Sequence, residues 1–121
     1  MQWSSILLST LVPFALSYTP LKDAEAELQI RNRLSLYSIS IDKDDFAQLD
    51  QVFTPDVTIN YNVPGVGTLN GLPAVKQYLT KVLTGFNTQH TISTTLVDKG
   101  AGGKNGPDAV STAYLVAFYF G

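Results

Sequence analysis

The spacing of apolar residues predicts a long first helix. From residue 24 onward they follow a period of about 3.6 residues, which is typical of an amphipathic helix. Asp23 is a candidate N-cap, so we expect this helix to begin at Ala24. Its apolar stripe consists of Ile30, Leu34, Tyr37 and Ile41. An acidic turn at residues 42–45 ends it.

The same periodicity predicts further helices. One begins at Asp44 or Asp45 and ends before Pro55, with Phe46, Leu49, Val52 and Phe53 on its buried face. The next begins near Pro73, because the first turn of a helix tolerates proline, and Gly85 suits its C-terminal end. We expect its buried side to carry Val75, Leu79, Val82 and Leu83.

Elsewhere the pattern alternates, as expected for half-buried strands. Residues 57–63 form a predicted strand that places Tyr61 on its apolar side, and residues 68–69 form a short return strand. The next strand covers residues 88–98 and places His90, Ile92, Thr94 and Leu96 on one face. A glycine-rich loop at 99–108 leads to a last strand at 109–120, with one bulky face and one face of smaller residues. Helices followed by antiparallel strands indicate an α+β fold.

Composition narrows the functional classes. The chain has 121 residues, enough for a single domain, and 45% of them are apolar. The net charge of −2 and the scattered Lys and Arg residues argue against a nucleic-acid partner. Without cysteine there is no disulfide framework, and a single histidine cannot form a site with several His ligands. We therefore expect no metal and no organic cofactor.

Residues 1–17 differ from the rest of the chain. They carry no charged side chain, and small residues at Ala15 and Ser17 fit a signal-peptidase site before Tyr18. The apolar run is too short to span a bilayer comfortably, so we predict no membrane span. We interpret residues 1–17 as a signal peptide and expect residues 18–121 to be secreted. The alternative is a buried N-terminal helix.

Several short motifs together resemble the SnoaL-like domains of the NTF2-like superfamily, in particular secreted, fungal-type relatives of scytalone dehydratase. They are Ile41–Phe46, Phe53–Asp56 with Tyr61, Gly71–Val75, and Thr88–His90. The resemblance implies an α+β cone, in which N-terminal helices pack on a curved, mostly antiparallel sheet around a pocket. Two long strands normally follow in that fold, so the end at Gly121 predicts either a truncated chain or an edge completed by another subunit, and we favour truncation.

The resemblance also implies a catalytic set. His90 would act as the base, Asp42 would orient it, and Tyr61 would polarise a substrate carbonyl. Histidine exchanges protons near neutral pH, and a carboxylate partner fixes its tautomer. We expect six further residues to line the pocket: Tyr37, Ile41, Phe53, Ile92, Tyr114 and Phe118. Each of these residues also has a purely structural interpretation, as part of the core or of a turn.

One departure limits the expected chemistry. Scytalone dehydratase-like enzymes carry a second histidine on the strand that corresponds to residues 109–120. Here these residues contain no histidine. We therefore predict an uncertain enzyme that would be a lyase or isomerase, abstracting a proton next to a carbonyl. The alternatives are a pocket that binds an apolar small molecule without turnover, and a module that forms a homodimer through its sheet.

Overall fold

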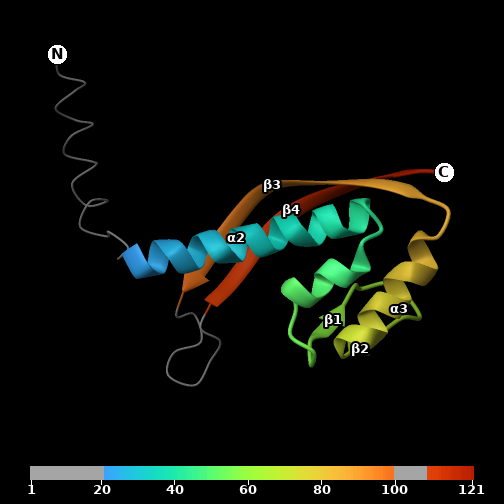
Figure 1. Cartoon of the computed structure of the whole chain (residues 1–121), viewed down its shortest axis with the longest axis horizontal. Helices are drawn as coiled ribbons and strands as arrows, with labels where there is room; N and C mark the ends of the chain where they lie inside the picture. The colour runs from blue at the N-terminus through green and yellow to red at the C-terminus, as the bar shows by residue number, and fades with distance from the viewer. Residues whose placement is uncertain (1–20, 100–108) are drawn as a thin grey trace, which may run out of the picture.

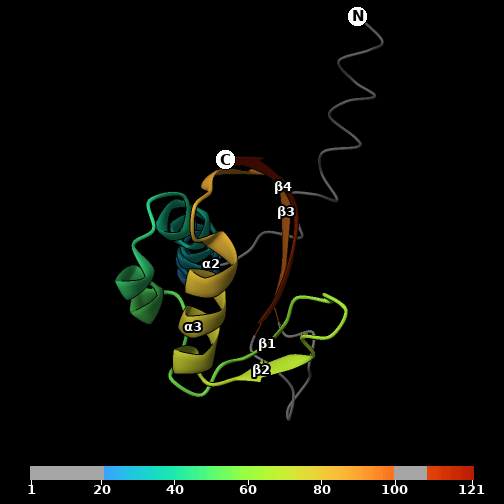
Figure 2. The same ribbon diagram turned by 90° about the vertical axis from the view of Figure 1, so that its right-hand side faces the viewer.

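The computed structural model describes residues 21–99 and 109–121. The predicted signal peptide and most of the glycine-rich loop lie outside these residues. Helix α2 (Leu21–Asp42) runs along the curved ribbon formed by β3 (Asn87–Lys99) and β4 (Ala109–Phe120) (Figure 1). Seen from the side, α2 and α3 (Leu72–Leu83) lie on the concave side of that ribbon (Figure 2). The α+β class predicted from the sequence is therefore confirmed.

The sheet consists of two separate antiparallel pairs in the described part of the chain. Strands β1 (Thr58–Asn60) and β2 (Thr68–Asn70) form one short pair, and β3 and β4 form the other. The strand predicted over residues 57–63 is thus only residues 58–60. A turn follows it, in which the Asn62 amide donates to the Asn60 side chain and Asn62 has a φ of 55°. Tyr61 consequently lies just beyond the strand.

Two helices differ from expectation, one in where it begins and the other in its type. Helix α2 starts at Leu21 rather than Ala24. The second predicted helix is a 3₁₀ helix, η1 (Phe46–Gln51), after Asp45. The Asp45 side chain accepts a hydrogen bond from the Gln48 side chain at 2.6 Å and caps no backbone amide. Tight 3₁₀ turns suit such short connections, and η1 still buries Leu49 completely.

The core lies between the helical segments. It is formed by Ile41, Leu49, Leu72, Val75, Leu79 and Leu83. The predicted inner face of α3 is confirmed for Val75, Leu79 and Leu83, whereas Val82 is 40% exposed at the edge of this face. Gly85 has a φ of 85°, the left-handed conformation that a helix C-terminus favours.

An irregularity in β3 reverses its faces. Ile92 pairs with Leu115 and Thr94 pairs with Tyr114, so Ser93 is an extra residue without a partner in the register. Before it, Thr88, His90 and Ile92 are on the more buried face; after it, Thr95 and Val97 are. The prediction that Thr94 and Leu96 share the face of His90 is therefore wrong, and Leu96 is 66% exposed.

The bulky face of β4 is the outer one. The more buried positions of β4 are Ala109, Ala113 and Ala117 on the other face, whereas Tyr114 and Phe118 on the bulky face are 69% and 51% exposed. The prediction that Tyr114 and Phe118 line the interior pocket is wrong, because both side chains leave the sheet on its convex side.

Candidate functional site

The site forms where the end of α2 meets the beginning of β3. Asp42 is the last residue of α2 and accepts three hydrogen bonds from β3. The His90 backbone amide donates to Oδ2 at 2.9 Å, while Thr88 Oγ1 donates to Oδ1 at 2.9 Å. His90 Nδ1 lies 2.6 Å from Oδ1. The structure thus brings together two residues of the predicted catalytic set, Asp42 and His90.

These contacts determine the protonation state of the Asp42 carboxyl group. Partial burial raises the pKa of Asp42, but the hydrogen bonds from the His90 amide, the His90 ring and Thr88 outweigh this effect. The pKa is therefore held below its usual value of 3.8, and Asp42 is a carboxylate at neutral pH. A carboxylate only accepts hydrogen bonds, so the ring proton of neutral His90 lies on Nδ1 and leaves Nε2 unprotonated.

His90 lines an open cavity of about 280 Å³. Its side chain is only 7% exposed, and Nε2 has no hydrogen-bond partner among the described residues. The other walls come from α2, α3 and β4, and include Tyr37, Ile41, Tyr61, Tyr78, Leu83 and Tyr119. The His90 ring thus borders a mostly apolar space.

Tyr61 lies on the wall of the same cavity. The Tyr37 hydroxyl donates to the Tyr61 hydroxyl at 3.2 Å, and the Tyr61 ring stacks on Tyr78 with a centroid distance of 5.4 Å. Burial raises the pKa of Tyr37 and of Tyr61 above the usual 10.0, so both hydroxyls keep their protons at neutral pH. Because Tyr61 accepts from Tyr37, its own proton is available to another acceptor.

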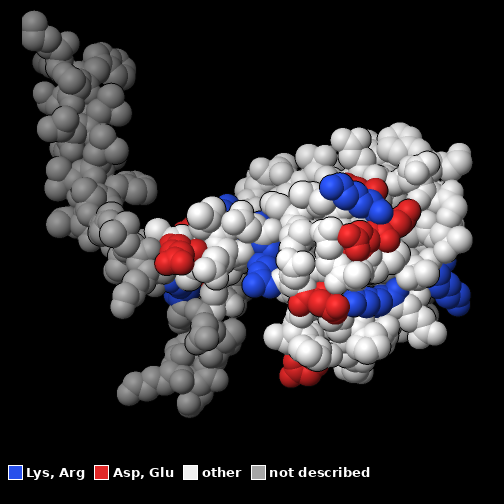
Figure 3. All heavy atoms as spheres, viewed as in Figure 1, with Lys and Arg blue, Asp and Glu red and all other residues white. Residues whose placement is uncertain are grey.

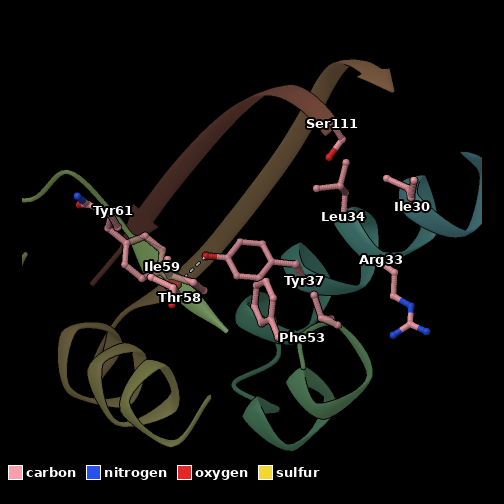
Figure 4. A pocket seen from close by; sticks show the side chains of 11 residues that line it. Ile30, Arg33, Leu34, Tyr37, Phe53, Thr58, Ile59, Tyr61 and Ser111 are labelled. Carbon is pink, nitrogen blue, oxygen red and sulfur yellow. Dashed lines mark hydrogen bonds between the residues drawn. The ribbon is translucent and has the colours of Figure 1, made fainter. Parts of the chain in front are cut away.

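A larger cavity of about 600 Å³ lies on the other side of the two tyrosines. Figure 4 shows the Tyr37 ring reaching across it from α2, with its hydroxyl turned toward Tyr61. Its walls are mainly apolar and include Ile30, Leu34, Val52, Phe53 and Ile59. Arg33 lines the rim, and Ser111 contributes from β4.

The predicted pocket residues are placed as follows. Tyr37 lines both cavities, Ile41 lines the smaller one, and Phe53 lines the larger one. Ile92 is on the same face of β3 as His90 but lines neither cavity. Tyr114 belongs to a shallow surface depression on the outer face, together with Thr94, Leu96 and Thr112.

Sequence reasoning missed Thr88 and Tyr78 as site residues. Thr88 was used only as part of a motif, although its two-residue spacing from His90 already puts both on one strand face. Tyr78 lies three residues after buried Val75, so helical periodicity was the available signal.

Acidic and basic side chains are mixed on the face shown in Figure 3, without a single-sign patch. Within residues 21–99 and 109–121, no three His, Asp or Glu side chains are grouped to hold a metal ion. None of the helices in those same residues is long and apolar enough to cross a membrane.

Comparison with known proteins agrees with this architecture. A family model described as a SnoaL-like domain matches residues 22–121. A stretch of 59 residues is 44% identical to uncharacterised proteins of Mycobacterium bovis and of two strains of Mycobacterium tuberculosis. The match covers 49% of this chain and 40% of each relative. SnoaL-like domains have the NTF2-like α+β fold. The helices on the concave side of the antiparallel ribbon agree with that fold. The chain belongs to the SnoaL-like domain family.

Proposed function

We propose that the protein is an isomerase or lyase that removes a proton next to the carbonyl group of an apolar small molecule. The observation that carries this proposal is the His90 ring, which Asp42 holds through Nδ1 and which lines a cavity. A positioned general base contributes about 10²–10⁴-fold to the rate.

Each group has a defined role in the proposed step. His90 Nε2 takes the proton from the carbon next to the carbonyl, and the C–H electron pair moves to form an enolate. Asp42 stabilises the imidazolium through its bond to Nδ1. The Tyr61 hydroxyl donates to the developing enolate oxygen, and Tyr37 supports it through the bond between the two hydroxyls.

The composition of the cavity favours isomerisation over loss of water. Dehydration needs an acid at the leaving hydroxyl, and the residue opposite His90 on β4 is Ala117. An isomerisation needs only one base, because the proton held on His90 Nε2 returns to another carbon of the same molecule. We therefore place isomerases first, and dehydratases of the scytalone dehydratase type second.

The test uses ketones whose double bond is not yet conjugated, beginning with 3-cyclohexen-1-one and extending to larger homologues. Conversion to the conjugated enone is followed by ultraviolet absorbance. We expect His90→Gln to lower the rate by about 100-fold or more. Thr91→Gln serves as the control, because it introduces glutamine at the neighbouring position, which is exposed. Equal rates for wild type and His90→Gln would disprove the role of His90.

A second candidate is binding without turnover. Apart from His90, the ionisable groups on the two cavity walls are tyrosines and Arg33, so the interior offers little acid–base chemistry. This candidate requires that apolar ligands raise the melting temperature equally for wild type and His90→Gln. It also requires that none of the ketones is converted.

We also propose secretion after cleavage behind Ser17, and self-association through the exposed outer face of the sheet. The intact mass of the native protein tests the cleavage site and also shows whether the natural chain extends beyond Gly121. Light scattering over a concentration series tests association, and a monomer at every concentration would rule it out.

A further inference from the structure

The two cavities share a wall. Tyr37 and Tyr61 line both of them, and their hydroxyls are joined by the hydrogen bond of 3.2 Å. Figure 4 shows this pair at the end of the larger cavity that is away from Arg33. A molecule whose carbonyl meets the Tyr61 hydroxyl therefore has the His90 cavity on one side and the larger cavity on the other.

The volumes assign different parts of a ligand to the two spaces. Pockets for small molecules usually measure about 300–1,000 Å³. The cavity beside His90, at about 280 Å³, is just below this range and suits only a small part of a long ligand, whereas the larger one has about 600 Å³. We infer that the ligand is an elongated, mainly apolar carbonyl compound that extends from His90 past the tyrosine pair into the larger cavity.

The lining of the larger cavity defines what that extension contains. Its wall next to Tyr37 is formed by Leu34 and Phe53, with Ile30 farther out along α2. Burying apolar surface against such walls contributes about 25 cal/mol per Å². An aliphatic chain or a fused ring system fits these walls, whereas a polyhydroxylated molecule would lose its hydration without replacement.

Arg33 adds a charge preference at the outer end. It is the only charged residue on this cavity wall, it is exposed, and it has no ion-pair partner among the described residues. Its neighbour at the adjoining surface depression, Asp50, is paired with Lys76 at 2.6 Å. The outer end of the ligand is therefore neutral or acidic, because a basic group would meet the guanidinium.

Two fluorescent probes with one aromatic skeleton test this assignment. N-phenyl-1-naphthylamine is neutral, and 1-anilinonaphthalene-8-sulfonate adds a sulfonate. Leu34→Trp fills the larger cavity, and Leu96→Trp makes the same change on the exposed outer face of the sheet. We expect Leu34→Trp to weaken binding of the neutral probe at least tenfold and Leu96→Trp to change it less than twofold. Unchanged binding in Leu34→Trp, or equal weakening in both variants, would overturn the assignment.

Far-ultraviolet circular dichroism and thermal melts establish that each variant is folded. Ile30→Trp replaces Leu34→Trp if the latter does not fold, since Ile30 lines the same cavity farther from the core. Arg33→Gln should weaken the sulfonated probe three- to tenfold and leave the neutral probe within twofold. Lys81→Gln, an exposed residue on α3, is the matched charge control. Equal effects of Arg33→Gln on both probes would remove the charge preference.

The orientation of the ligand rests on the proposed function. Experiments can nevertheless disprove the ligand placement and the isomerase activity independently. Probe binding that is lost in Leu34→Trp but kept in His90→Gln supports the larger cavity even if no ketone is converted. Conversely, His90-dependent conversion with no effect of Leu34→Trp on the longer ketones would uphold the isomerase and overturn the elongated ligand. If both hold, Leu34→Trp slows only the longer ketones.

Discussion

The two faces of the β3–β4 ribbon carry their large side chains in the opposite way from a simple core. On the concave face, β4 presents Ser111, Leu115, Ala117 and Tyr119 to the two cavities. On the convex face it presents Tyr114 and Phe118, which are 69% and 51% exposed. The small side chains among these, Ser111 and Ala117, leave space between the sheet and the helices. The comparison teaches that the bulkier face of a strand is not necessarily the packed one, since an interior cavity requires room.

The largest expected effect comes from removing the residue that switches the faces within β3. Deleting Ser93 would force one half of the strand to present its other side, because side chains alternate with a period of two. We expect the free energy of unfolding to fall by about 3 kcal/mol or more, as large changes of buried side chains do. Urea titration measures this.

Ser93→Thr keeps the extra residue and serves as the control, with a change below about 1 kcal/mol. A deletion variant as stable as the wild type would show that the irregularity does not determine which side chains face the helices.

The helices under the concave face provide the next test. Leu49→Ala removes a side chain that is 0% exposed, and we expect a loss of about 3 kcal/mol, from lost burial and from the space left behind. Leu96→Ala makes the same change where the side chain is 66% exposed, with an expected loss below about 0.5 kcal/mol. Similar urea midpoints for these two variants would contradict the inner and outer assignment.

A substitution of Asp42 tests how much its hydrogen bonds between α2 and β3 contribute to stability. Asp42→Asn replaces a charged acceptor of three hydrogen bonds, and we expect a loss of about 2 kcal/mol at pH 7. The lowered pKa of Asp42 means that its contribution is complete above its unfolded value of 3.8. The contribution is lost as the pH falls below that value through the folded pKa.

The stability difference between wild type and Asp42→Asn should therefore shrink toward pH 3, as measured by urea unfolding at both pH values. Asp44→Asn is the control in the same turn, where the exposed residue lies beyond the helix end. A difference that stays constant between pH 7 and pH 3 would mean that the ionised carboxylate contributes nothing.

The smallest effect is expected on the convex face. Tyr114→Ser removes a large side chain that is 69% exposed, so the free energy of unfolding should change by about 0.5 kcal/mol or less. Tyr37→Ser, on the concave side, removes the ring that contacts Phe53 and should cost clearly more. Equal unfolding midpoints for the two variants would be incompatible with the comparison.

The sequence predicted the elements where the periodicity was long and unbroken. Both β4 and the buried side of α3 were identified in this way. The exposed Leu96 was misplaced because nothing in the alternation marks Ser93 as the extra residue; its position is set by pairing with β4. Likewise, the spacing of residues cannot reveal that Asp42 meets His90, which are 48 positions apart. The resemblance supplied that pair, and the exposed positions of Tyr114 and Phe118 required the fold.

The manner in which Asp42 is held has a consequence for how this protein can evolve. One of its oxygens is bound by the backbone amide of residue 90, which every amino acid except proline provides. A change of the side chain at position 90 can thus remove the proposed base while helix and strand stay joined. A change at position 42 alters both the attachment and the ring orientation. Descendants that abandon catalysis and keep the pocket should accordingly vary at position 90 before position 42.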